Sequence, residues 1–214
     1  MGDGTLSSWQ GGNPGEATRI AALVEGCGFR ARPLRSPQGW GYHRVTALGT
    51  VLVIDAAPPP ATRMARVGSA STLALEVSDG PQRLIVNCGG PGTTPFGLLH
   101  SRALSLGNDG KEIRGLDRLQ PKGRKKIREA APYAIRFHLA PDVEAVPTAD
   151  GLGAILRSPA APPWNFRCRG AQLLIEESVV VDGRAQLRST SQLVIVGEVS
   201  SLGAEINWLL RRSS

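Results

Sequence analysis

Two histidines and one arginine are the side chains of this sequence best suited to acid–base chemistry. In residues 135–139 the apolar side chains take one face of a predicted strand, and Arg136 and His138 take the other. His100 lies at the start of another predicted strand. We interpret Arg136, His138 and His100 as candidate catalytic residues, because imidazole titrates near neutral pH. The alternative is that both histidines are partly exposed strand residues without a catalytic role.

A short basic run provides the second candidate, a binding site for anions. Residues 122–128 hold five cations, which are Lys122, Arg124, Lys125, Lys126 and Arg128. The run lies between two predicted strands, so it is expected in a loop. Arginine forks bind carboxylate, sulfate or phosphate oxygens in pairs, and the alternative is an ordinary solvated surface. Aromatic residues are missing from the run, which argues against single-stranded nucleic acid as its partner.

Other kinds of chemistry lack their motifs. The sequence has no HExxH, HxH or paired-cysteine spacing, so we expect neither a metal nor a cofactor. It has no GxSxG nucleophile turn and no Walker A pattern. Cys27, Cys88 and Cys168 are far apart and odd in number, which excludes a disulfide framework. We interpret them as small buried apolar residues.

Charge and length limit the possible classes of protein. The chain has 214 residues, with 25 lysines and arginines against 18 acidic residues, for a net charge of +7. This excess favours an anionic partner. No apolar stretch approaches the ~20 residues of a membrane span, and no secretory leader is recognisable in the first thirty residues. From these features alone we expect no membrane span and cannot assign a location.

Only one segment has helical periodicity, at residues 16–25, where Ile20, Leu23 and Val24 recur at helical spacing before Gly26. From residue 40 onward the period is two. Turn residues separate predicted strands at 42–47, 50–56, 73–78, 83–88, 99–106, 112–119, 134–139, 153–157, 165–169, 171–181, 188–198 and 204–211. We therefore predict an all-β protein, an antiparallel β-sandwich of more than ten strands with one short N-terminal helix.

Several segments together resemble one known family. Residues 72–80 and 84–89 resemble the core hairpin of the heparinase II/III family. Further matching pieces follow in order at 96–102, 116–119, 135–141, 174–179 and 207–210. The resemblance covers residues 42–211, and the ordered set is more specific than any single piece. It identifies residues 41–214 as the C-terminal sandwich, and residues 1–40 as a linker with a short helix left from the junction with a helical domain.

The resemblance implies a polysaccharide lyase of the cell envelope or periplasm. Such enzymes join a helical toroid to a β-sandwich and cleave uronic-acid glycans by β-elimination. The reaction needs a cation for the uronate carboxylate, a base for the C5 proton and an acid for the leaving oxygen. In the family the toroid supplies part of these groups, including a tyrosine. The implied partners are thus an acidic polysaccharide and a helical toroid domain encoded upstream.

The sequence departs from the family pattern where a metal could bind. Residues 67–69 replace a His-x-His segment, Asn87 stands where an aspartate often follows the strand, and residues 92–95 replace a longer stretch carrying a histidine. Serine and asparagine are poor zinc ligands. We therefore predict the sandwich of a heparinase II/III-type lyase that is truncated and inactive alone. The alternatives are a basic, non-catalytic module for acidic glycan or nucleic acid, of which nucleic acid is disfavoured, and a hydrolase with an unrecognised site.

Overall fold

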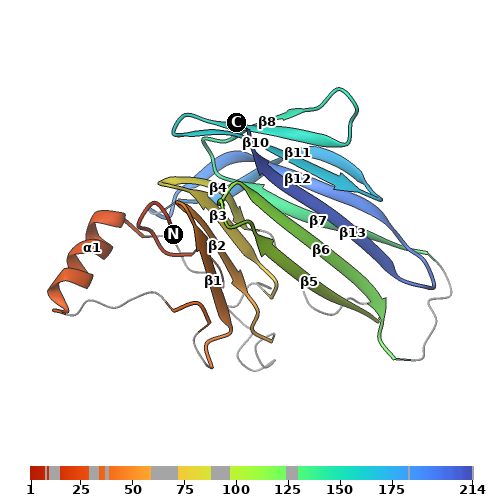
Figure 1. Cartoon of the computed structure of the whole chain (residues 1–214), viewed down its shortest axis with the longest axis horizontal. Helices are drawn as coiled ribbons and strands as arrows, with labels where there is room; N and C mark the ends of the chain where they lie inside the picture. The colour runs from red at the N-terminus through yellow and green to blue at the C-terminus, as the bar shows by residue number, and fades with distance from the viewer. Residues whose placement is uncertain are drawn as a thin grey trace.

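Two antiparallel sheets face each other across one core in the computed structural model (Figure 1). The structure describes residues 1–7, 9, 15–28, 34–36, 39–58, 72–87, 97–123, 130–182 and 184–213. Within these residues lie one helix and thirteen strands. They are α1 (Ala17–Gly26), β1 (Tyr42–Ala47), β2 (Thr50–Asp55), β3 (Leu75–Asp79), β4 (Gln82–Asn87), β5 (Leu98–Leu106), β6 (Glu112–Pro121), β7 (Ala131–Leu139), β8 (Glu144–Pro147), β9 (Gly153–Ser158), β10 (Ala161–Arg169), β11 (Gln172–Val181), β12 (Leu187–Val199) and β13 (Ala204–Arg212).

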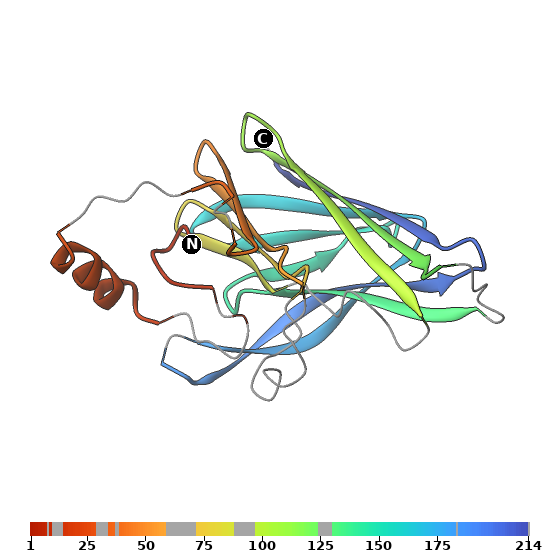
Figure 2. The ribbon, with the colours of Figure 1, turned by 90° about the horizontal axis from the view of Figure 1, so that it is seen from below.

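The strand order brings distant segments together. One sheet has seven strands in the order β1-β2-β3-β4-β7-β12-β11, and the other has six in the order β5-β6-β13-β10-β9-β8. Strand β4 is therefore hydrogen-bonded to β7, although the chain builds the β5–β6 hairpin of the other sheet between them. Figure 2 shows the two layers, with the β5–β6 hairpin in the layer that does not contain β4.

Alternating burial identifies the inner face of each strand. Along β6, Ile113, Asp117 and Leu119 are buried, whereas Arg114 and Arg118 are exposed. The core centres on three aromatic rings. Phe137 of β7 meets the Phe166 ring edge-on at 5.0 Å between centroids and the Trp208 ring at 5.1 Å. The two sheets are thus joined by aromatic packing, which combines large apolar burial with favourable ring geometry.

Gly115 is required by this packing. A Cβ atom built at this position would lie 1.9 Å from Cε2 of Trp208, far inside contact distance. Gly115 and Trp208 are direct cross-strand partners on β6 and β13. The indole ring therefore occupies the space that a side chain at residue 115 would need.

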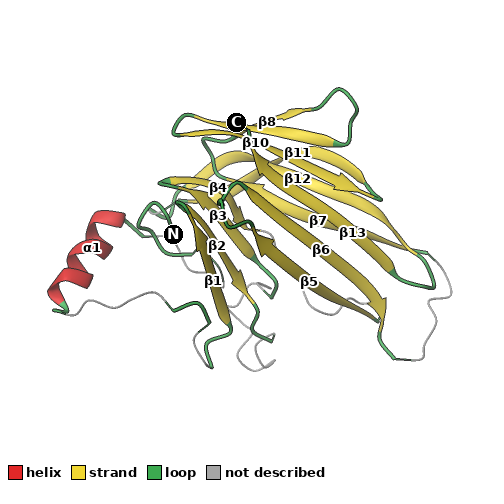
Figure 3. Cartoon of the chain, in the orientation of Figure 1, coloured by secondary structure: helices red, strands yellow, loops and turns green. Residues whose placement is uncertain are grey.

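The N-terminal residues cover part of the outer face of the seven-stranded sheet. The Gly2 amide donates to Ser78 Oγ at 3.1 Å, and Asp3 forms an ion pair with Arg83 at 2.9 Å. Trp9 is buried and stacks on Tyr42 at 5.8 Å between ring centroids. This cover explains why every residue of β3, including those that point away from the core, is buried. In contrast, α1 has no buried residue and stands apart from both sheets (Figure 3).

The predicted fold class is confirmed. The helix, expected at 16–25, spans Ala17–Gly26, and the predicted strands are present with ends shifted by a few residues. The short strand β8 was missed, because four residues that include a proline carry little periodic signal. No helix among the described residues is long and apolar enough to cross a bilayer.

Candidate functional site

His100 lies between the two sheets and is held by a buried carboxylate. Its Nε2 atom lies 2.5 Å from Oδ1 of Asp117, which has no exposed surface. Arg102 Nε donates to the same oxygen at 2.8 Å, and Trp208 Nε1 donates to Oδ2 at 2.7 Å. One carboxylate thus joins side chains from β5, β6 and β13.

The electrostatics of this cluster keep Asp117 ionised. Burial by itself would raise the pKa of the carboxyl, but the charge of Arg102 and the hydrogen bonds from His100 and Arg102 outweigh it, so the pKa is lowered. Arg102 is buried as well, donates to the carbonyl of Leu73 at 2.8 Å and lies 5.8 Å from the centre of the Phe137 ring. The His100 imidazole is therefore held in a fixed orientation, and it points into the interior of the sandwich.

A second cluster repeats this arrangement without a histidine. Asp79 of β3 accepts a hydrogen bond from Trp164 Nε1 at 3.1 Å and pairs with Arg212 at 3.2 Å. Asp79 belongs to the seven-stranded sheet and Trp164 and Arg212 to the six-stranded sheet, so this cluster connects the two sheets. In the first cluster Asp117, Trp208 and His100 all belong to the six-stranded sheet, and its hydrogen bond toward the other sheet runs from Arg102 to the Leu73 carbonyl, just before β3.

His138 and Arg136 lie on the outer face of the seven-stranded sheet. The two side chains alternate with the buried Ile135 and Phe137 along β7. His138 Nδ1 lies 2.7 Å from the Ser178 hydroxyl of β11, and the direction of that hydrogen bond depends on the imidazole tautomer. The two residues are thus together on one surface, as the sequence predicted.

Cross-strand pairing places three further polar residues in a row with His138. Asn87 of β4 and Gln192 of β12 are its direct partners on either side, and Gln192 pairs in turn with Glu176 of β11. We call Asn87, His138, Gln192 and Glu176 the polar row. Gln192 Nε2 donates to Glu176 Oε2 at 3.3 Å, and its buried Oε1 atom lacks a donor among the described residues.

Charge in the polar row is balanced, and its histidine is neutral. Arg136 pairs with Glu176 at 2.6 Å, with both side chains about two-fifths exposed. Burial lowers the pKa of His138, and the nearby positive charge of Arg136 lowers it further. At neutral pH the imidazole therefore carries no charge and can accept a proton. Beside it lies a guanidinium of the kind that binds carboxylates.

The structure brings together two of the three predicted catalytic residues. Arg136 and His138 share the outer face of the seven-stranded sheet, whereas His100 points inward from the six-stranded sheet. Of the basic run, Lys122 is exposed just beyond the end of β6. The remaining residues of that run, Arg124, Lys125, Lys126 and Arg128, lie outside the described residues.

Sequence reasoning missed most of the polar row. Glu176, Ser178 and Gln192 lie in predicted strands, and alternation alone does not reveal which strands are neighbours. Asn87 was noted only as a departure from the family pattern. The register of the β11–β12 pair could have been inferred from the turn between them, but the contact of β7 with both β4 and β12 could not.

The described residues contain no group of three or more histidines, cysteines or acids that could hold a metal ion.

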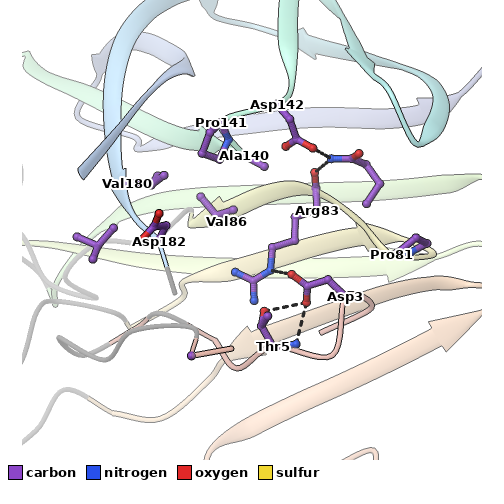
Figure 4. A pocket seen from close by; sticks show the side chains of 13 residues that line it. Asp3, Thr5, Pro81, Arg83, Val86, Ala140, Pro141, Asp142, Val180 and Asp182 are labelled. Atoms are coloured by element: carbon purple, nitrogen blue, oxygen red, sulfur yellow. Dashed lines mark hydrogen bonds and ion pairs between the residues drawn. The ribbon is translucent and has the colours of Figure 1, made fainter. Parts of the chain in front are cut away.

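A cavity of about 240 Å³ lies away from the polar row, between the N-terminal segment and the end of the seven-stranded sheet (Figure 4). The guanidinium of Arg83 lies at its edge, paired with Asp3 and donating to the Leu6 carbonyl at 2.6 Å. Gln82 donates to Asp142 at 2.9 Å on the opposite side. The polar groups of this cavity are thus largely engaged with one another.

A comparison with models of protein families shows which family the chain belongs to. The model described as "Heparinase II/III-like, C-terminal" matches residues 30–95 and 90–209, which is most of the chain. The chain belongs to this family. The two matched pieces overlap at residues 90–95.

Relatives of this heparinase II/III-like chain include lyases and one protein named for a different property. FtsZ-localized protein C of Caulobacter vibrioides is 25% identical over 285 residues, covering 100% of this chain and 49% of the relative. Heparan sulfate lyase HepC of Pedobacter heparinus has the same fold, with a TM-score of 0.74, 9% identity and coverage of 99% of this chain and 44% of HepC. A lysine-methylated heparinase III gives a TM-score of 0.72 at 8% identity, covering 100% and 44%. The chain spans about half the length of the proteins it matches.

Proposed function

We propose that this chain is the sandwich half of a heparinase II/III-like protein of the cell envelope, and that it holds an acidic glycan against the polar row. In this proposal residues 1–40 link the sandwich, residues 41–214, to a helical domain that forms the opposite wall of the site. The observation that carries the proposal is the placement of His138 and Arg136, two residues apart on β7, on the outer face of one sheet.

The chemistry of β-elimination assigns a role to each group. Arg136 would neutralise the uronate carboxylate, which acidifies the C5 proton, and His138 would accept that proton. The basic run from Lys122 to Arg128 would hold neighbouring acidic sugars by charge. His100, held on Asp117 in the interior, would act as a positioning residue in this scheme rather than contact the glycan.

The sandwich alone lacks two parts of such a site. Among the described residues of the sandwich we assign no acid to the leaving oxygen, and one sheet face cannot orient a sugar as a cleft with two walls does. Orientation and positioned acid–base groups each contribute large rate factors, with the latter worth about 10²–10⁴-fold. We therefore expect the isolated chain to bind acidic polysaccharide but not to cleave it.

The test combines turnover with retention. The purified chain is incubated with heparin, heparan sulfate, alginate and hyaluronan, and the ultraviolet absorbance of the unsaturated product is followed. We expect no sustained turnover, and weak retention on immobilised glycan that is lost as salt rises. The double variant Arg136→Ser/His138→Gln should weaken retention, with Arg44→Ser as a control elsewhere on the surface. Sustained turnover lost in His138→Gln, or retention equal to wild type in the double variant, would refute the proposal.

A second candidate function rests on the FtsZ-localized relative. Its 25% identity extends over the whole chain, whereas the lyases share only the fold at 8–9% identity. Under this alternative the sandwich is a non-catalytic module of a protein that localises with FtsZ. Co-localisation of a fluorescent fusion with FtsZ, unchanged in Arg136→Ser/His138→Gln, would favour this alternative over the glycan site.

A further inference from the structure

The outer face of the six-stranded sheet carries a regular set of arginines that the polar row does not use. Five arginines project from the three central strands of that sheet, namely Arg114 and Arg118 of β6, Arg211 of β13, and Arg167 and Arg169 of β10. All five are exposed, and each alternates with buried residues along its strand. We call these five residues the arginine face.

Strand register arranges the face as a lattice. Arg114, Leu209 and Arg167 form one cross-strand row, and Leu116, Asn207 and Arg169 form the next. Neighbouring strands are about 4.8 Å apart and alternate residues about 6.8 Å apart along a strand. Arginines therefore flank Leu209 on both sides in the first row, and Arg169 follows Arg167 along β10, on a face that no described segment covers. Helix α1 lies at the far end of the molecule, beyond β1 (Figure 1).

Positive charge on the face exceeds negative charge. Glu112 is the partner of both Arg114 and Arg211, so it can balance only one of them. Arg118 pairs with Glu205 at 2.9 Å, and Arg167 pairs with Asp150. Among the described residues Arg169 has no ion-pair partner. Two positive charges are thus uncompensated, and the exposed Lys122 follows directly at the end of β6.

The side chains between the arginines restrict the class of partner. No aromatic ring of these strands points outward, because Trp164, Phe166 and Trp208 are all buried in the core, so stacking of single-stranded bases has no platform. Leu116 and Leu209 are only partly exposed and offer no protruding apolar group to a bilayer. Exposed arginine forks spread over three neighbouring strands match a flexible chain that carries repeated carboxylates or sulfates.

We propose that the arginine face is a second binding surface for acidic polysaccharide, on the side of the sandwich opposite to the polar row. The proposal rests on the proposed function in taking the same class of ligand, but it assigns that ligand a separate surface. The two surfaces lie on different sheets, so substitutions can abolish binding at one surface without altering the other.

The experiment measures binding of a fluorescent heparin oligosaccharide to the whole chain by anisotropy over a range of salt concentrations. The test variant is Arg114→Ser/Arg167→Ser/Arg169→Ser. The matched control removes three exposed arginines from elsewhere and changes the net charge equally, as Arg19→Ser/Arg184→Ser/Arg188→Ser. We expect the test variant to bind about 10-fold more weakly, with a smaller salt dependence, and the control to stay within about twofold of wild type. Circular dichroism and thermal unfolding confirm that both variants fold.

Each other outcome has a defined meaning. Equal weakening in both variants would show a general effect of charge and overturn the proposal. Wild-type affinity in the test variant, with binding lost in Arg136→Ser/His138→Gln, would overturn it while leaving the proposed function intact. Preferential loss of binding to duplex DNA or phosphatidylserine vesicles, with heparin binding unchanged, would also overturn it. If the wild-type chain binds none of the polysaccharides at low salt, the proposed function itself fails.

Discussion

Replacing Asp117 by asparagine should strongly destabilise the protein, because it removes the carboxylate that forms an ion pair with the buried Arg102. The Arg102 side chain is 1% exposed and that of Asp117 is not exposed at all, so solvent cannot compensate for the loss. Removing one partner of such a pair costs about 3–5 kcal/mol in unfolding free energy. The Trp208 indole also loses its charged acceptor. A loss of about 4 kcal/mol is a large part of the ~5–15 kcal/mol that a typical domain has.

Urea unfolding followed by tryptophan fluorescence measures this difference. For a domain of this size each kcal/mol lowers Tm by about 2–4 °C, so thermal unfolding should shift down by about 10 °C. The control is Glu205→Gln, which removes an exposed ion pair with Arg118 and should cost less than about 1 kcal/mol.

A double variant tests the reason for the effect. Replacing Arg102 by methionine in the Asp117→Asn background removes the buried guanidinium charge as well and should recover part of the stability. If Asp117→Asn costs no more than Glu205→Gln, or if the double variant is less stable than the single one, the carboxylate does not serve to balance Arg102 and the reasoning is wrong.

Two further predictions concern His138 and Gly115. The pKa of His138 is lowered below its ordinary value of 6.5, so as pH falls the unfolded chain binds the proton before the folded chain does. The free energy of unfolding should therefore decline below about pH 6.5, and should decline less in His138→Gln. Urea unfolding at a series of pH values measures this, together with an NMR titration of the imidazole. A flat profile in wild type would contradict the assignment. Gly115→Ala places a methyl group against Trp208 and should cost about 1–3 kcal/mol in unfolding free energy. The control is Gly26→Ala, where φ is outside the left-handed region and nothing lies within 4 Å of the added methyl group. Equal stability of the two variants would show that the indole can move aside.

The strands and several of their turns could be predicted from the sequence, because both depend on neighbouring residues. Period-two alternation defined the strands from residue 42 onward. The Leu48–Gly49 turn also held, since both residues have positive φ, 40° and 92°, as a two-residue hairpin turn requires. The hairpin register makes Arg102 the direct partner of Asp117, whereas predicted strands that end at residue 106 and begin at residue 112 would pair Arg102 with Leu116. The sequence therefore indicated the hairpin but missed this contact by one residue of register. The burial of Arg102 and Asp117 between the sheets was not implied.

The candidate site, in contrast, depends on the order of strands that are distant in the sequence. Residue types singled out Arg136 and His138 as one face of a strand, and that much is a property of local alternation. Whether that face met solvent or the core, and which side chains completed it, depended on β7 lying between β4 and β12. The strand order is determined by how well the two sheets pack around their aromatic core. That packing energy is summed over the whole chain, so no local sequence pattern predicts it. The same packing sent His100 inward to Asp117, so the residue types were available from the sequence, and only the tertiary structure decided which of them meet.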